Sequence, residues 1–273
     1  MKIRIKFKKS GSMKFIGHLD VMRYFQKALR RAEIDVLYSQ GFNPHQLMSF
    51  ASPLGVGLTS DGEYLDVMVG ETTNSKDMMD RLNSTMVEGF EIIKVKQVIN
   101  ENKNAMSVVA AADYRISLKD GFVFETAEDT TVSESKYDLS TLVEPNKFQS
   151  AFEDFMAQDE IVIMKKSKKS EREVNIRPWI YEVSYKDNES NSNTVADVYD
   201  NGCKVFLKLA TGSANNLKPE LVMEAFSNFV GAKFNEFAFQ VHRIEVYEEL
   251  DGGATETINV EKLVPLDYET KEF

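Results

Sequence analysis

Apolar and polar residues alternate at the start of the chain and then change to a longer period. Ile3, Ile5 and Phe7 alternate with cations, and this period of two predicts a half-buried strand over residues 3–7. From about residue 17 to residue 33 the apolar residues recur every three or four positions, which predicts a helix with one apolar stripe. The other side of this helix carries a basic stripe that consists of Arg23, Lys27, Arg30 and Arg31.

Strands and a second helix are predicted up to about residue 100. Strands over residues 47–51 and 63–69 are expected to meet across an Asp61-Gly62 turn, because Asp-Gly is a strong hairpin signal. A helix over residues 76–86 and a strand over residues 90–98 complete the order βαββαβ of a ferredoxin-like unit. The first strand of such a unit is central. Its cations are therefore expected on the face without helices, where they can meet a ligand or a second module: Lys2, Arg4, Lys6 and Lys8.

The rest of the chain is predicted to repeat this plan more loosely. Residues 100–104 are polar and form the expected linker. Helices are predicted over residues 145–157 and 219–230, and strands over residues 110–118, 160–165, 174–185, 194–199, 203–210 and 237–247, with an acidic insertion at 126–140. The predicted fold class is α+β, with two tandem ferredoxin-like modules at residues 1–100 and 105–250, the second carrying insertions. Residues 251–273 form an acidic tail that we expect to pack loosely.

Charge is distributed unevenly along the 273 residues. The net charge is −10, yet residues 1–35 hold ten Lys or Arg and three Asp or Glu, so they carry +7 and the remainder −17. Such polarity indicates an oriented contact with an anionic partner, either RNA or an acidic protein. A solvated basic face without a partner is the alternative at this stage.

Cysteine and histidine are too few for several kinds of site. Cys203 is the single cysteine, which excludes an internal disulfide, a four-thiolate zinc site and an iron–sulfur cluster held by three cysteines of this chain. The three histidines lack metal-ligand spacing, so no metal and no cofactor are predicted. No apolar run reaches the roughly 18 residues that cross a bilayer, and the first residues lack the apolar core of a signal peptide. We therefore expect a cytoplasmic protein without a membrane partner.

His18 is the first candidate for chemistry, because it lies in the first turn of the basic helix. A helix N-terminus disfavours the imidazolium and favours anions, so a neutral His18 is suited to donate to a phosphate or act as a base. The alternative is that His18 only packs at the start of the helix. His242, in the last predicted strand, is interpreted as structural.

The loop that follows the basic helix is the second candidate. It offers flat side chains next to hydrogen-bonding groups, a combination suited to a base or a small planar ligand. A self-contained turn is the alternative. Arg177, beside Trp179, is a third candidate as a stacking pair. The predicted binding residues are His18, Arg23, Lys27, Arg30, Tyr38, Gln40, Gly41, Phe42, Asn43, Pro44, His45 and Arg177.

Three segments resemble the bacterial radical SAM-linked protein family, a domain of unknown function. They are GHLDVMRYFQKALRRAEIDVLYSQGFNPHQLMSFASPLGVGLTSDGEYLDV at residues 17–67, RPWI at residues 177–180 and TGSANNLKPELVMEAF at residues 211–226. In that family the domain is fused to, or encoded beside, a radical SAM protein. The resemblance implies an accessory or substrate-presenting role for this chain. Our first hypothesis combines this role with the basic region: a non-catalytic partner of a radical SAM enzyme that binds RNA or a ribonucleoprotein. The resemblance carries over no reaction.

Two other functions remain open. The tandem ferredoxin-like plan is similar to that of CRISPR repeat-processing endoribonucleases, which implies a metal-independent RNA-processing or RNA-modifying enzyme. His18, His45 and Arg23 would then supply a base, an acid and a cation if the loop folds over the start of the helix. The third function is a protein–protein adapter that binds no nucleic acid.

Overall fold

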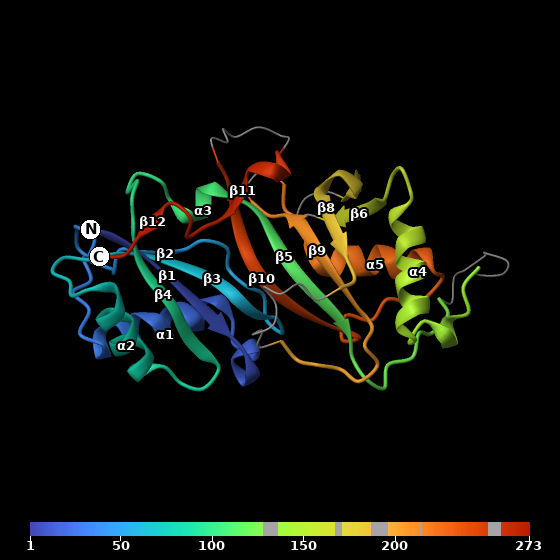
Figure 1. The fold of residues 1–273 in the computed structure, drawn as a ribbon, viewed down its shortest axis with the longest axis horizontal. Helices are drawn as coiled ribbons and strands as arrows, with labels where there is room; N and C mark the ends of the chain where they lie inside the picture. The colour runs from blue at the N-terminus through green and yellow to red at the C-terminus, as the bar shows by residue number, and fades with distance from the viewer. Residues whose placement is uncertain (128–135, 167–170, 187–195, 213–214, 251–257) are drawn as a thin grey trace.

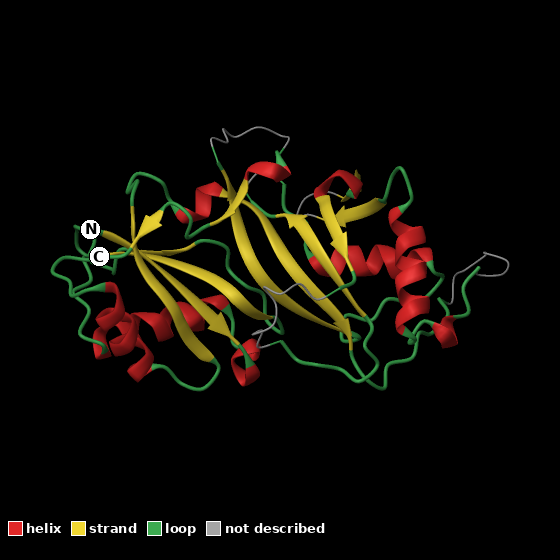
Figure 2. Cartoon of the chain, viewed as in Figure 1, coloured by secondary structure: helices red, strands yellow, loops and turns green. Residues whose placement is uncertain are grey.

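The computed structural model describes residues 1–127, 136–166, 171–186, 196–212, 215–250 and 258–273. These residues form a mixed helix-and-strand protein built on one large, mostly antiparallel sheet (Figure 1). The longer helices of the first half lie toward one end of the sheet and those of the second half toward the other (Figure 1 and Figure 2). No described helix combines the length and the apolar character that a membrane span requires.

The sheet has eight strands on its main path, ordered β12-β4-β1-β3-β10-β5-β9-β8, with β2 paired to β3 and β11 to β10. The strands are β1 (Lys2–Lys9), β2 (Met48–Phe50), β3 (Thr59–Met68), β4 (Phe90–Val98), β5 (Val109–Leu118), β8 (Ile180–Ser184), β9 (Lys204–Ala210), β10 (Phe239–Glu249), β11 (Leu263–Pro265) and β12 (Thr270–Lys271). A separate hairpin pairs β6 (Val162–Lys166) with β7 (Glu171–Asn175).

Four of the α-helices are those that the apolar spacing predicts, with small differences at their ends, and a fifth, short helix at Ala105–Val108 was not predicted. The α-helices are α1 (His18–Arg31), α2 (Ser75–Thr85), α3 (Ala105–Val108), α4 (Pro145–Met156) and α5 (Pro219–Phe229). Short 3-10 helices are η1 (Gly11–Phe15), η2 (Leu139–Thr141), η3 (Arg177–Trp179) and η5 (Val260–Lys262). Asn74 caps α2 by accepting a hydrogen bond from the backbone of Asp77, and α4 and α5 begin with proline, which lacks the N–H that a first turn leaves unpaired.

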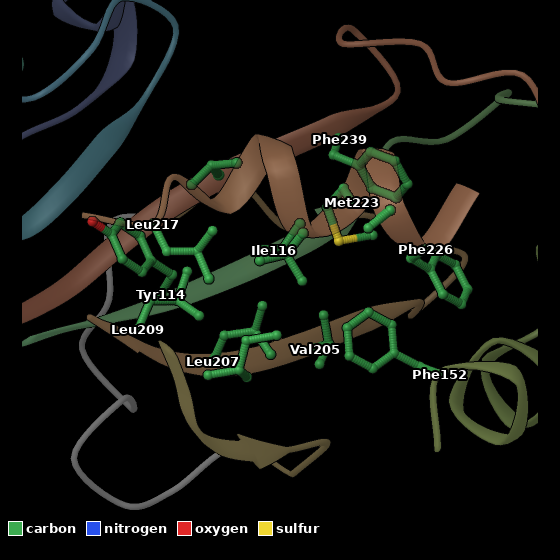
Figure 3. Close-up of a cluster of buried hydrophobic side chains, with 14 of the residues drawn as sticks. Tyr114, Ile116, Phe152, Val205, Leu207, Leu209, Leu217, Met223, Phe226 and Phe239 are labelled. Atoms are coloured by element: carbon green, nitrogen blue, oxygen red, sulfur yellow. The ribbon is translucent and has the colours of Figure 1, made fainter. Parts of the chain in front are cut away.

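Each half of the molecule has its own apolar core. In the first half α1 and α2 cover one face of strands β4-β1-β3-β2, so that Val21, Phe25 and Leu29 pack against Ile5 and Leu65. In the second half α4 and α5 cover strands β10-β5-β9-β8 in the same way. Figure 3 shows this core, in which Phe152 and Phe226 lie over Ile116, Val205 and Leu207.

The two halves join through β3 and β10, the one parallel pair of the described sheet, which aligns His242 with Thr59 and Arg243 with Ser60. The predicted Asp61-Gly62 turn is wrong, because both residues lie within strand β3. Gly62 instead permits close approach of β10: a Cβ at this position would lie 2.6 Å from the carbonyl oxygen of Ile244. The strand pairing of the two predicted modules is therefore continuous.

The C-terminal segment does not form a loose tail. Residues 251–257 lie outside the described residues, but residues 258–273 pack along the sheet face opposite α1 and α2, with Leu266 fully buried. β11 pairs with β10, and β12 adds an edge strand next to β4. The prediction failed because two short strands and one buried leucine leave little apolar periodicity in the sequence.

The predicted strand over residues 194–199 is also wrong where it is described, since residues 196–199 are not in a strand and β9 pairs with β8 and β5. Pro178 interrupts the predicted strand over residues 174–185 as expected, because it lies in η3 between β7 and β8. The acidic insertion at 126–140 falls largely on residues 128–135, outside the described residues. After the expected linker at 100–104, the short helix α3 packs near β2 and β3.

Candidate functional site

The exposed side of α1 carries the basic stripe. Arg23, Lys27 and Arg30 are exposed, and their spacing of four and three residues puts them on one side of the helix over about 10 Å. Arg23 contacts Asp20 at 3.3 Å, and Nε of Arg30 donates to the carbonyl oxygen of Gln26. These cations are held by helix geometry and stay accessible to an anion.

The loop of residues 38–45 is exposed along nearly its whole length. Phe42 is completely exposed, and Tyr38, Gln40, Asn43 and Pro44 are exposed as well. Gly41 has φ +115°, a conformation that favours glycine. The loop closes on itself where Ser39 Oγ and His45 Nδ1 lie 2.8 Å apart and the His45 N–H donates to the same hydroxyl oxygen at 3.1 Å.

The loop and the basic stripe belong to one surface. Gln46, directly after the loop, donates from Nε2 to the carbonyl oxygen of Gln26 on α1 and to the hydroxyl of Tyr38, both at 3.4 Å. Arg30 donates to that same Gln26 carbonyl oxygen. The loop is thereby fastened to the side of α1 that bears Arg30. We call the exposed residues of this surface, Arg23, Lys27, Arg30, Tyr38, Phe42 and His45, the helix–loop surface.

Most other cations of the first 35 residues are engaged inside the protein. Arg4 forms a buried two-pronged ion pair with Asp66, at 2.7 and 2.9 Å. Lys6 pairs with Glu245 of β10, and Lys14 contacts Asp197 at 2.8 Å. The row on β1 therefore meets the second half and the C-terminal segment. The positive charge of the N-terminal region that remains accessible is concentrated on α1.

His18 is half-buried at the start of α1. Its ring lies edge-on to Phe50, with 5.1 Å between the centroids. Burial lowers the pKa of His18, nearby Glu63 opposes this shift, and Lys9 adds to it. A neutral imidazole at this helix start agrees with the sequence interpretation, but its neighbours are not those of His45, which pairs with Ser39. Within the described residues no contact joins the two histidines.

Arg177 lies apart from the helix–loop surface, in η3 of the second half. Its Nε donates to the carbonyl oxygen of Met156 at 3.3 Å. The expected stacking with Trp179 is replaced by Lys165, whose Nζ lies 5.2 Å from the centroid of the indole ring. The contact of Arg177 is therefore internal to the second half, and this residue does not belong to the helix–loop surface.

A buried polar cluster between the two halves was missed by the sequence analysis. Arg243 of β10 donates to Glu63 of β3 at 2.9 and 2.5 Å and to the hydroxyl of Ser52 at 3.1 Å. Lys9 is buried beside this pair and donates to the carbonyl oxygen of Ile16; its burial lowers the pKa of its amine. The sequence held one indication of this cluster: Lys9 continues the alternation of Ile3, Ile5 and Phe7 and so occupies a position of β1 that faces the core.

His242 is buried in the same junction and has a structural environment. Its Nδ1 lies 2.9 Å from the hydroxyl of Thr59 and its Nε2 lies 3.0 Å from Asp61. Both neighbours belong to β3, so the imidazole connects the two halves. Within the described residues, no three His, Cys, Asp or Glu side chains gather as ligands of a metal ion.

A pocket of about 240 Å³ lies next to the loop, on the sheet face opposite α1 and α2. It is lined by His45, Leu47, Ser49, Asp66, Met68 and Lys2, among others. His45 thus borders both the pocket and the exposed loop.

A small apolar patch lies at the other end of α1. Phe15, Leu19 and Val56 are 68%, 60% and 59% exposed. The loop that holds Val56 is tied to this region, because the N–H of Gly57 donates to the carbonyl oxygen of Lys14 at 2.7 Å. Solvent-exposed aromatic and aliphatic side chains grouped in this way are typical of a contact surface.

Comparison with known proteins gives a family without an assigned activity. Residues 2–219 match the family described as "Uncharacterized protein conserved in bacteria (DUF2344)". This region includes α1, the loop, the pocket and all of the first half apart from Met1 and β12. No curated protein matches the chain. The chain therefore belongs to the bacterial DUF2344 family.

Proposed function

We propose that this chain is an RNA-recognising accessory protein of a radical SAM enzyme. The observation that carries the RNA part is the helix–loop surface, where the fully exposed Phe42 shares a surface with Arg23, Lys27 and Arg30. Proteins that bind single-stranded RNA combine cations along the backbone with aromatic side chains on which bases stack. The radical SAM part rests on the family resemblance of residues 17–67.

Each element of the surface has a distinct role in this proposal. The three cations neutralise phosphates, and this contribution is independent of sequence and sensitive to salt. Phe42 and Tyr38 provide stacking surfaces, worth about 1–3 kcal/mol for each stacked base. Ring stacking needs exposed flat side chains held in place, and the Ser39–His45 contact fixes the base of the loop.

Fluorescence anisotropy with a labelled single-stranded RNA of about 12 nucleotides tests the proposal. The variant Arg23→Gln/Lys27→Gln/Arg30→Gln is expected to weaken binding and to flatten the plot of log K against log salt by about 2, at about 0.7 for each cation. Phe42→Ser is expected to weaken binding about 5- to 100-fold without changing that slope.

A matched control removes the same charge elsewhere. Lys76, Lys136 and Lys271 are exposed and lie outside the helix–loop surface. Their joint replacement by glutamine should leave the affinity close to that of the wild type. Equal losses in both triple variants would mean that net charge, and not this surface, governs binding, and the RNA proposal would be abandoned.

The accessory role also needs a docking site, and the apolar patch of Phe15, Leu19 and Val56 supports one. We propose that the radical SAM protein docks here, because an apolar surface separate from the cations can be covered while RNA occupies the helix–loop surface. A radical SAM protein purified from the same organism provides the assay. Leu19→Asp should abolish its binding, whereas Phe42→Ser should not. Retention of full affinity by Leu19→Asp would refute this docking site.

We further propose that the two halves are tandem ferredoxin-like modules in a cytoplasmic protein. The strand orders β4-β1-β3-β2 and β10-β5-β9-β8 support this. When the strands of each half are numbered along the chain, without the hairpin β6-β7, both orders read fourth, first, third, second, the order of a ferredoxin-like sheet. The hairpin β6-β7 is then an insertion of the second module. A single buried thiol, Cys203, suits a reducing compartment.

A further inference from the structure

The pocket beside the loop is lined mainly by residues on one face of the sheet. Ser49 pairs with Asp66 across β2 and β3, and Lys2 pairs with Met68 across β1 and β3. The alternate residues Phe50 and Leu65 face the core under α1, so Ser49, Asp66 and Met68 face the opposite side. His45 and Leu47 precede Ser49 at intervals of two and line the same pocket.

The charged groups of the pocket already have hydrogen-bond partners within the protein. Asp66 accepts from Arg4 and from the backbone N–H of Ala105. Lys2 donates from Nζ to the carbonyl oxygen of Lys103 at 3.0 Å and to that of Glu101. A charged ligand would have to disrupt these contacts, so the pocket favours a neutral one.

Several neutral polar groups of the residues that line the pocket have no hydrogen-bond partner within the described residues, among them Ser49 Oγ, His45 Nε2 and the buried Gln46 Oε1. The Ser39 hydroxyl accepts from the His45 N–H and so is free to donate its own proton to His45 Nδ1. When it does so, a neutral imidazole carries its proton on Nε2, as a donor. Leu47 and Met68 provide apolar walls, and a methionine sulfur makes favourable contacts with aromatic rings.

The size of the pocket limits the ligand to one ring system. Its volume of about 240 Å³ lies below the range of about 300–1,000 Å³ that holds drug-sized ligands. A neutral, planar heterocycle with hydrogen-bonding edges fits these conditions, and a nucleobase is such a group. We infer that the pocket receives one unstacked base of the RNA whose backbone follows the helix–loop surface. This inference rests on the proposed function and adds the place where a base is bound.

The test compares an RNA that carries bases with an abasic ribose-phosphate oligomer of the same length, both by fluorescence anisotropy. Ser49→Leu fills the pocket without changing any charge. It is expected to weaken binding of the base-bearing RNA about tenfold and to leave binding of the abasic oligomer and the salt slope unchanged. His45→Phe keeps a ring but removes both ring nitrogens, the Nε2 donor and the Nδ1 that contacts Ser39, and because His45 is exposed this variant should fold normally. It is expected to show the same selective loss.

The outcomes separate this inference from the proposed function. If both variants bind the base-bearing RNA as tightly as the wild type, and the triple Arg23, Lys27 and Arg30 variant still loses binding, the pocket is refuted and the RNA function stands. If the wild type binds neither oligomer, the RNA function and the base pocket both fail. A loss of abasic binding in Ser49→Leu would overturn the pocket, because the substitution would then act on the backbone contacts.

Discussion

The ion pair between Glu63 and Arg243 gives a direct test of how the two halves are joined. Both side chains are almost completely buried, at 5% and 3% exposure, and they come from strands that belong to different halves. Glu63→Leu leaves the guanidinium of Arg243 without its counter-charge, while the contacts of Arg243 with Ser52 remain. Removing one partner of a buried pair costs about 3–5 kcal/mol, a large part of a typical stability of about 5–15 kcal/mol.

Urea denaturation measures this loss. Circular dichroism follows the whole chain, and the fluorescence of Trp179 follows the second half, where this residue packs. The urea concentration at the midpoint should fall equally for both signals, because the pair of Glu63 and Arg243 connects the first half to the second. Arg23→Gln, which breaks an exposed pair, should cost only about 0.5 kcal/mol.

The double variant Glu63→Leu/Arg243→Met completes the cycle. Replacing both charges by apolar side chains removes the unpaired guanidinium, so most of the lost stability should return. A loss below about 1 kcal/mol in Glu63→Leu would refute the argument that the junction depends on this buried pair. An unchanged Trp179 transition would instead show that the halves unfold separately.

Three further predictions concern Gly62, Asp113 and Cys203. Gly62→Ala should cost about 1–3 kcal/mol in urea denaturation, because the new methyl group would overlap the backbone of Ile244 and Glu245; unchanged stability would contradict the close approach of β10. Burial raises the pKa of Asp113 from 3.8 to about 6, so the folded state keeps a proton that the unfolded chain releases, and the free energy of unfolding should fall as the pH rises from about 4 to about 6. Asp113→Asn should remove this slope, and an equal slope in both proteins would assign it to other groups. Burial also raises the pKa of Cys203 to about 11, so the thiol should react with Ellman's reagent only after unfolding; rapid reaction of the native protein would contradict its burial.

Local patterns were enough to locate most elements of the sheet and the helices. The period of two in β1 and the apolar stripe of α1 depend on residues close in sequence, and so does the positive φ of Gly41. The pairing of β3 with β10 joins residues about 180 positions apart and leaves no local signal. Asp61-Gly62 therefore suggested a turn, although its glycine serves a contact with a distant strand.

The candidate site was also predicted only in part, because some of its features depend on neighbouring residues and others on residues far along the chain. Residues 38–45 form an exposed loop because glycine, asparagine and proline favour a turn locally. The neutralisation of Arg4, Lys6 and Lys14 depends on Asp66, Glu245 and Asp197, which lie far along the chain. The number of accessible cations was therefore overestimated from the sequence. The pocket could not be predicted at all, because its walls come from three different strands.

The position of β10 and β12 has a consequence for synthesis of the chain on the ribosome. Residues 1–98 contain β1 to β4 and the helices between them, yet β10 and β12, which pair with β3 and β4, are made more than 130 residues later. Until then the nascent first half exposes unpaired edges, which favour association with other chains. A chaperone that shields strand edges would therefore be needed most after β4 has emerged and before β10 has been translated.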